Sequence, residues 1–190
     1  MSQSYDAFKQ DVEEHNPNSG TNSSDGLWEW VKAIILAVGL ALIIRLLLFA
    51  PIVVDGESML PTLHDKERLI VNKAVYLWGE PKRGDIIVFH ATHDKDWIKR
   101  VIGESGDVVE VKNGVLYING EQIEEPYLDP SAGFMMHDFR EVVPEGELFV
   151  MGDNRPNSRD SRNIGTIPIS SVVGRAELVF WPLQDIRLVK

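Results

Sequence analysis

The apolar segment from residue 33 to residue 50 constrains this chain more than any other feature. Arg45 is the only charge among its 18 residues. Helical residues rise by about 1.5 Å each, so a segment of this length approaches the roughly 30 Å hydrocarbon thickness of a bilayer. Trp28 and Trp30 precede the segment at positions that suit a membrane interface. The sequence therefore predicts one membrane-spanning helix over residues 27–50.

Two other interpretations would also account for an apolar segment of this length. A buried core helix would need a larger surrounding domain than the rest of the chain provides. A cleavable secretory signal needs small residues before the cut, whereas a cut after Ala50 would place Leu48 at −3 and Pro51 just beyond the bond. We therefore predict an uncleaved anchor. The positive-inside rule does not orient it, because basic residues stand on both sides, namely Lys9, Lys32, Lys66, Arg68 and Lys73.

Residues 1–26 are acidic and polar, with too little apolar surface to fold, so we predict a disordered acidic tail. The whole chain of 190 residues has a net charge of −10 and no cysteine. The acidic balance argues against nucleic acid as a partner, since phosphate binding uses clustered cations. The absence of cysteine excludes disulfides, thiolate metal sites and cysteine nucleophiles. Residues 51–190 remain for one soluble domain.

After the anchor, the pattern changes to short β-branched runs separated by turn signals. Asn113-Gly114 joins two runs as a predicted type I′ hairpin, and Asn119-Gly120 marks another turn. The spacing is too short for crossover helices, so we predict a mainly β fold with a partly closed, antiparallel, barrel-like domain. Residues 121–144 have the weakest pattern. The predicted strands are 52–54, 68–71, 85–89, 97–102, 108–111, 115–118, 148–150 and 172–181.

Two segments place a reactive residue type in an unusual setting. Ser58 follows a predicted strand and lies close to Gly56, where a flexible backbone would let a substrate approach the Ser58 N–H. Lys99 lies in an apolar strand, where burial would lower its pKa and let the neutral amine take a proton from a serine hydroxyl. Each has an ordinary alternative: Ser58 as a polar turn that caps a short helix, and Lys99 as a strand lysine with its amine in water.

Three further motifs are weaker evidence for a function. Arg83-Gly84-Asp85 matches an adhesion tripeptide, but it directly precedes a strand, where a turn is expected. Residues 152–162 are dense in polar and turn-forming types, which predicts a rigid loop able to support a nearby nucleophile. A group of metal-ligand types falls in a predicted polar loop between strands, so an ordinary loop is the simpler interpretation. Its members are His90, His93, Asp94 and Asp96, with His64 and His137 elsewhere in the chain.

Four blocks of the chain resemble type I signal peptidases in residues, order and spacing, from the anchor to about Val189. These blocks are Ser58-Met-Leu-Pro-Thr-Leu63, Arg83-Gly-Asp-Ile-Ile-Val-Phe89, Lys99-Arg-Val-Ile-Gly103 with Gly106-Asp107, and Gly152-Asp-Asn-Arg-Pro-Asn-Ser-Arg-Asp-Ser-Arg162. The short segment between Lys99 and Gly152 is similar to the compact branch of Gram-positive bacteria. The resemblance implies a membrane-anchored Ser–Lys serine endopeptidase that removes signal peptides from secreted preproteins, cutting after small residues at −1 and −3.

The resemblance also implies roles for individual residues. Ser58 is the expected nucleophile and Lys99 its general base. Ser158 matches a serine that hydrogen-bonds and orients the lysine, while Asp160 and Arg162 match an ion pair that holds the loop. The expected substrate-binding residues are Ile52, Val54, Met59 and Ile98.

The resemblance further implies where the enzyme acts and what it binds. The tail would be cytoplasmic, the anchor would cross the cytoplasmic membrane once, and residues 51–190 would be extracytoplasmic. Expected partners are signal peptides and the lipid bilayer, with no nucleic acid, no metal and no cofactor. Gly56 departs from members with a large extra domain, which have an oxyanion-binding serine there, so backbone N–H groups, chiefly that of Ser58, would serve instead.

Two competing interpretations stay open at this point. The first is a non-catalytic anchored β module that binds envelope partners and retains the motifs as scaffold. The second is the self-cleaving Ser–Lys fold of LexA-type repressors, which is coupled to a DNA-binding domain. This chain has an acidic tail and an apolar segment in that place.

Overall fold

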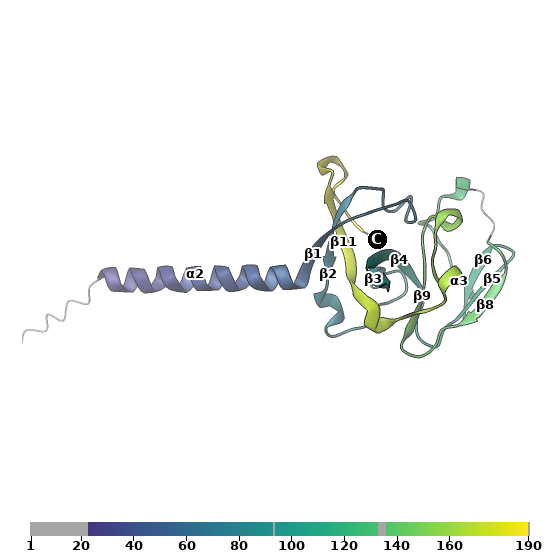
Figure 1. Ribbon diagram of the computed structural model, residues 1–190, viewed down its shortest axis with the longest axis horizontal. Coiled ribbons are helices and arrows are strands. Elements are labelled where there is room, and N and C mark those ends of the chain that lie inside the picture. Colours follow the sequence, from purple (N-terminus) through teal and green to yellow (C-terminus); the bar gives the residue numbers. More distant parts are fainter. Residues whose placement is uncertain (1–22, 93, 133–135, 190) are drawn as a thin grey trace, which may run out of the picture. The chain divides into compact units, whose positions relative to one another are not determined.

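The computed structural model describes residues 23–92, 94–132 and 136–189 (Figure 1). The chain divides into two compact units, Met1–Ile43 and Ile44–Lys190. The first unit contains most of helix α2 (Ser23–Leu48), and the second contains the strands.

Helix α2 carries apolar side chains around its whole circumference, as a helix in lipid does, rather than along one buried stripe. Its segment Leu27–Arg45 is long and apolar enough to cross a membrane, and none of that segment is buried in the structure. Trp30 and Leu36, for example, are 72% and 74% exposed. This exposure argues against the alternative of a buried core helix.

The observed helix is shifted relative to the predicted anchor over residues 27–50. It begins at Ser23, and serine and aspartate are residue types that favour a helix start. It ends at Leu48, because Phe49 and Ala50 already pair with the next strand as part of β1 (Phe49–Val53). Most of the predicted tail, residues 1–22, lies outside the described residues.

A larger sheet joins strands that are far apart in sequence, and every strand pair in the described chain is antiparallel. This confirms the predicted mainly β fold, although the sheet is open rather than closed into a full barrel. The spatial order is β1, β2 (Arg68–Asn72), β11 (Val172–Trp181), β3 (Ile86–Thr92), β4 (Lys95–Gly103), β9 (Glu147–Met151) and β10 (Ile167–Pro168), with β12 (Arg187–Leu188) against β11.

A smaller sheet has the order β7 (Glu121–Gln122), β6 (Val115–Ile118), β5 (Val108–Lys112) and β8 (Phe139–Val142). Both predicted turns are confirmed: Asn113 and Gly114 have φ of 51° and 79°, as a type I′ hairpin requires, and Asn119 and Gly120 also have positive φ. Strand β8 was not predicted, because its solvent-facing side chains leave no apolar alternation to read. Figure 1 shows this sheet on the side of β9 away from β2.

The hairpin of β3 and β4 is longer than predicted. His90, Ala91 and Thr92 continue β3, and Lys95 already begins β4, because cross-strand pairing holds these polar residues in extended conformation. Most of the expected loop between the two strands is therefore strand. The remaining helical elements are α3 (Ser161–Ile164) and the 3-10 turns η1 (Ala74–Tyr76), η2 (Pro130–Ala132), η3 (Arg155–Asn157), η4 (Ile169–Ser171) and η5 (Leu183–Asp185).

Three apolar clusters form the core of the described domain. The first contains Met59 and Leu63, from the segment between β1 and β2, packed with Val88 of β3. The other two lie between the smaller sheet and β9, around Phe149, and on the β3–β4–β9 side, around Phe89. The segment between β1 and β2 is thus packed against β3 and against β4, the strand that contains Lys99.

Candidate active site

Ser58 lies on the segment between β1 and β2, whose two ends are hydrogen-bonded to each other. Val54 and Glu67 are joined by a backbone hydrogen bond of 2.8 Å, and the Gly56 N–H donates to the Asp65 carboxylate at 2.8 Å. Gly56 has φ of 105°, a backbone conformation that residues with a Cβ rarely adopt. Met59, which follows Ser58, is 2% exposed and anchors the segment in the core. The serine is therefore held on a fixed turn.

Lys99 lies in the middle of β4 and is only 4% exposed. Its Nζ is 2.7 Å from Ser58 Oγ and donates to the Ile98 carbonyl at 2.9 Å. The Nζ also lies 5.6 Å from the centre of the Trp97 ring. The structure thus brings together the two residues that the sequence singled out, 41 positions apart, at hydrogen-bond distance.

Burial changes the protonation of Lys99. Loss of hydration disfavours the ammonium and lowers its pKa from 10.5 to about 8, although the carboxylates of Asp160 and Asp153 act in the opposite direction. A neutral amine is therefore accessible near neutral pH. A neutral amine within 2.7 Å of a hydroxyl can act as its general base.

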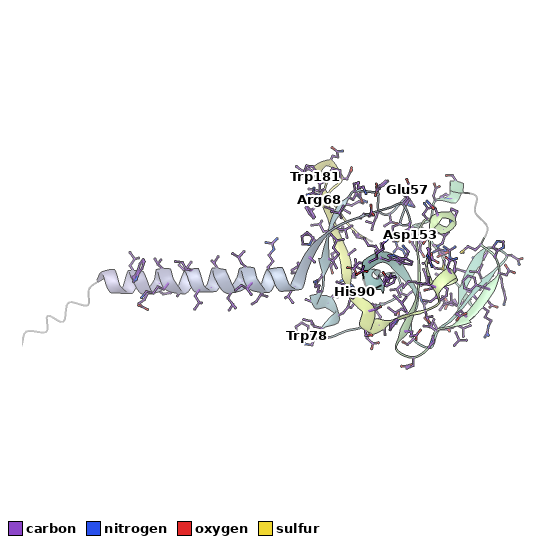
Figure 2. The ribbon with its side chains drawn as sticks, in the orientation of Figure 1. Glu57, Arg68, Trp78, His90, Asp153 and Trp181 are labelled. Carbon is purple, nitrogen blue, oxygen red and sulfur yellow. The ribbon has the colours of Figure 1, made fainter. Side chains whose placement is uncertain are left out.

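The loop of residues 152–162 holds the segment that carries Ser58. The Asn154 N–H donates to the Ser58 carbonyl at 3.0 Å, and the Asn154 side-chain amide donates to the Glu57 carbonyl at 2.9 Å. Gly152 allows this approach, because a Cβ there would lie 2.3 Å from Ser158 Oγ and 2.4 Å from the Ser58 carbonyl oxygen. Figure 2 shows Glu57 and Asp153 on these two segments. The loop and the serine segment are therefore closely packed.

Asp160 and Arg162 organise the same loop. The Arg162 guanidinium donates to the Asp160 carboxylate through Nη2 and Nε, at 2.7 and 2.8 Å, and the Gly152 N–H donates to it at 2.9 Å. Burial alone would raise the pKa of Asp160, but these donors hold it below its usual value. Ser158 Oγ is buried with no hydrogen-bond partner among the described residues, so its expected bond to Lys99 stays a prediction.

A second buried ion pair, which sequence reasoning missed, ties β4 to this loop. Arg100 donates to the Asp153 carboxylate through Nη2 and Nε, at 2.7 and 2.9 Å, and both side chains are almost completely buried. The Arg100 guanidinium also lies 3.9 Å from the centre of the Tyr127 ring. Side chains alternate along a strand, so Arg100 faces away from Lys99, but no local signal in the sequence pairs it with a carboxylate 53 residues away.

A pocket of about 240 Å³ opens beside Ser58 and Lys99. All four residues predicted to bind substrate line it, namely Ile52, Val54, Met59 and Ile98. Arg159 and Asp96 lie at the same pocket and are exposed. The lining of the pocket thus combines apolar side chains with charged ones.

The candidate metal ligands do not assemble into a site in the described part of the chain. His90 Nδ1 lies 2.6 Å from the Asp96 carboxylate across the β3–β4 hairpin. No group of three or more metal-ligand side chains is present among the described residues, and His93 lies outside them. The histidine–carboxylate pair is accounted for as a cross-strand contact.

Comparison with known proteins relates this geometry to a family. A family model described as "Signal peptidase, peptidase S26" matches residues 27–181. The chain is 49% identical to "Signal peptidase I" of Bacillus amyloliquefaciens over 94% of this chain and 100% of that protein. It is 46% identical to "Signal peptidase I S" of Bacillus subtilis (strain 168) over 90% of this chain and 97% of that protein. A crystal structure of a signal peptidase I from Enterococcus faecalis V583 is 38% identical, with a TM-score of 0.47, and covers 51% of this chain and 97% of that one. The chain therefore belongs to the signal peptidase family, peptidase S26.

Proposed function

We propose that this chain is a serine endopeptidase that removes N-terminal signal peptides from secreted preproteins, with Ser58 as nucleophile and Lys99 as general base. One observation carries the proposal: Lys99 Nζ lies 2.7 Å from Ser58 Oγ in a setting that lowers the pKa of the lysine to about 8. The relatives named signal peptidase I support this reaction class and substrate.

The reaction follows from the positions of these two groups. Neutral Lys99 accepts the Ser58 hydroxyl proton as Oγ attacks the scissile carbonyl carbon. The resulting ammonium returns that proton to the departing amine as the peptide bond breaks, which leaves an ester on Ser58. Water then attacks the ester, with Lys99 again taking the proton and passing it back to Oγ. The acid product leaves and both side chains return to their starting state.

Negative charge develops on the carbonyl oxygen during both attacks. The Ser58 N–H donates to no acceptor among the described residues, so it is available to this oxygen. No side-chain donor is assigned, because Gly56 stands where some relatives have a serine. The chain thus relies on backbone N–H groups for this charge.

The pocket beside Ser58 suits small side chains. It has a volume of about 240 Å³ and an apolar wall formed by Ile52, Val54, Met59 and Ile98. Small residues at −1 and −3 of a signal peptide would fit this wall without displacing it. Within the described part of the chain, strand β1 pairs with β2 alone, so its other edge could accept an extended peptide.

Helix α2 supports a membrane location for the enzyme. We propose a single-pass topology in the cytoplasmic membrane, with the N-terminus cytoplasmic and the peptidase domain outside. Only a few residues separate the end of α2 at Leu48 from Ser58. This short connection would keep the serine near lipid, where the apolar part of a signal peptide lies.

The decisive experiment uses the purified full chain in detergent against a preprotein with an Ala-x-Ala cleavage site. The cut position is read by mass spectrometry. Ser58→Ala and Lys99→Ala should each abolish cleavage, while the controls Ser170→Ala and Lys95→Ala, at exposed positions, should cleave as wild type does. Cleavage by Lys99→Ala at the wild-type rate would contradict the mechanism. Inactive wild type with intact folding would favour the non-catalytic module.

A further inference from the structure

One charged side chain at the pocket beside Ser58 has no part in the proposed reaction. Arg159 lines this pocket together with Ser58 and Lys99, and it is exposed. Its guanidinium carbon lies 6.0 Å from the centre of the Trp97 ring, and its side chain forms no ion pair or hydrogen bond within the described part of the chain. A guanidinium stays protonated in proteins. The pocket therefore carries a permanent positive charge without an anionic partner among the described residues.

The backbone on either side of Arg159 directs this side chain outward. Ser158 and Asp160 both have extended backbone, and Ser158 Oγ and the whole of Asp160 are buried. Side chains alternate along extended backbone, so Arg159 points the other way. Asp160 is also fixed by the Arg162 guanidinium and by the Gly152 N–H. The loop therefore holds the base of the Arg159 side chain in place at the pocket.

The carboxylates at the same pocket already have partners. Asp55 forms an ion pair with Lys66, and the Asp96 carboxylate lies 2.6 Å from His90 Nδ1 across the β3–β4 hairpin. The two buried carboxylates of the neighbouring loop are bound by guanidinium groups. Because the general base acts as a neutral amine, Arg159 is the cation at this pocket that is available to a substrate. The group that it would bind is an anion.

The ring of Trp97 relates Arg159 to one part of the substrate. Trp97 and Lys99 lie on the same face of β4, and Lys99 Nζ is 5.6 Å from the ring centre. In the proposed reaction this amine protonates the departing nitrogen, which belongs to residue +1, the first residue of the mature protein. Arg159 lies near the same ring, while residues −1 and −3 are expected at the apolar wall. We therefore expect Arg159 beside the start of the mature chain.

We propose that Arg159 determines specificity by binding an acidic side chain at position +1 or +2 of the preprotein. A guanidinium and a carboxylate form a charge-assisted and often bidentate pair. The enzyme then cleaves sites followed by Asp or Glu in preference to sites followed by the uncharged amides of the same size. This role rests on the proposed function, since only a substrate that is cut at Ser58 brings its +1 residue to Arg159.

The test compares matched soluble peptides that contain an Ala-x-Ala site, with the purified full chain in detergent. Each pair of peptides differs only in carrying Asp or Asn at −2, at +1 or at +2, and the measured quantity is the ratio of kcat/KM within the pair. Because exposed ion pairs are weak, we expect wild type to favour the acidic peptide by about two- to fivefold at +1 or +2. Arg159→Gln should abolish this preference, Arg159→Glu should invert it, and Arg159→Lys should retain part of it.

Controls separate this contact from other effects of charge. Arg140→Glu makes the same change in net charge as Arg159→Glu at an exposed position of β8, in the smaller sheet, and should keep the wild-type ratio. The assays are run about one unit above the Lys99 pKa of about 8, so that an acidic substrate does not act by protonating the lysine. Raising the ionic strength from about 0.01 M to about 1 M shortens the Debye length from about 30 Å to about 3 Å and should remove most of the preference.

Several results would overturn the specificity assigned to Arg159. One is an equal ratio in wild type and Arg159→Glu, and another is a wild-type preference that salt does not weaken, which would indicate recognition by shape. A preference that depends on Arg159 only at −2 would place the contact on the signal-peptide side of the bond. Cleavage of the Asn peptides without an Arg159-dependent ratio would contradict this specificity alone, whereas failure of wild type to cut any peptide would contradict the proposed function as well.

Discussion

At the scale of the residue, the chemistry depends on how a lysine can be neutral beside a serine. Lys99 has the carboxylates of Asp153 and Asp160 in its surroundings, and both would stabilise the ammonium. Each carboxylate, however, is bound by a guanidinium, Asp153 by Arg100 and Asp160 by Arg162. The two ion pairs offset much of the negative potential, so the desolvation of Lys99 prevails and lowers its pKa to about 8.

The pH dependence of the enzyme follows from this lysine. Because only the neutral amine accepts the serine proton, kcat/KM should rise with pH up to the pKa of about 8 and level off above it. Each pH unit below the pKa should lower the rate about tenfold. The measurement is a kcat/KM profile with a soluble peptide substrate. An acidic limb positioned near the pKa of a free carboxyl or of an unperturbed lysine would contradict the assignment of Lys99.

Gly152 gives a second prediction at this scale. In Gly152→Ala the new Cβ would lie 2.3 Å from Ser158 Oγ and 2.4 Å from the Ser58 carbonyl oxygen, so the serine segment and the loop must separate. Displacement by about 1 Å can cost about 100-fold in rate, so we expect a loss of that order in kcat. Gly79→Ala is the matched control, because its nearest contact would be an ordinary 3.6 Å. Retained activity in Gly152→Ala would show that the close packing is not required.

At the scale of the element, the sequence predicted the strands that carry buried apolar residues and failed where a strand is mostly exposed or polar. The central strands β2, β5 and β6 alternate buried and less buried residues, and their runs were visible as patterns. Strand β8 exposes most of its side chains, and the tip of the β3–β4 hairpin is polar, so cross-strand hydrogen bonds alone hold them extended. Pairing of this kind leaves no trace in a local pattern.

The candidate site shows the same division. Ser58 and Lys99 were predictable because each is a reactive type in an unusual local setting. The partnership of Arg100 with Asp153 was not, because it joins residues 53 positions apart whose types are equally common at surfaces. Nor could the sequence indicate that the short strand β12 reaches back to the segment between β1 and β2. That contact depends on the complete sheet.

Strand β12 contributes to stability through Arg187. Its guanidinium donates to the buried Glu67 carboxylate at 2.8 and 2.9 Å and to the Thr62 carbonyl at 2.7 Å, on the segment that carries Ser58. Arg187→Ala would leave a buried carboxylate without this partner, at a cost of about 1–3 kcal/mol in the free energy of unfolding. Thermal unfolding of the full chain in detergent measures the loss. Arg140→Ala, at an exposed position of β8, is the control and should change little.

The effect of Arg187→Ala on the free energy of unfolding should depend on pH, and the direction of that dependence tests the role of the ion pair. Burial would raise the pKa of Glu67, but Arg187 and the His64 N–H hold it below its usual value of 4.5. The ion pair therefore stabilises the fold above that value and is lost as the pH falls through the lowered pKa. The difference in melting temperature between wild type and Arg187→Ala should shrink under acidic conditions. A difference that stays constant on acidification would assign the effect to packing.

At the scale of the whole molecule, apolar residues are distributed unevenly between two parts of the chain. Helix α2 suits a lipid environment, and the domain that contains the strands suits water. Helix α2 exposes its apolar side chains and would be insoluble without lipid, whereas the described residues of the domain bury many of theirs in three clusters between and beside the sheets. The domain reaches this core without any cysteine. Its stability is therefore independent of the redox conditions of the compartment in which it lies.

The orientation of these two parts is a prediction that charge counting could not make, because basic residues flank α2 on both sides. We predict that the peptidase domain lies outside, where it would meet exported preproteins, with Ser23 at the cytoplasmic end of the helix. The cysteine-free chain again allows a direct test, with Ser23→Cys and Ser170→Cys expressed separately in cells. A membrane-impermeant maleimide should label Ser170→Cys in intact cells and Ser23→Cys only after permeabilisation, while salt washing releases neither variant. The reverse labelling pattern would contradict the topology, and release by salt would contradict the anchor.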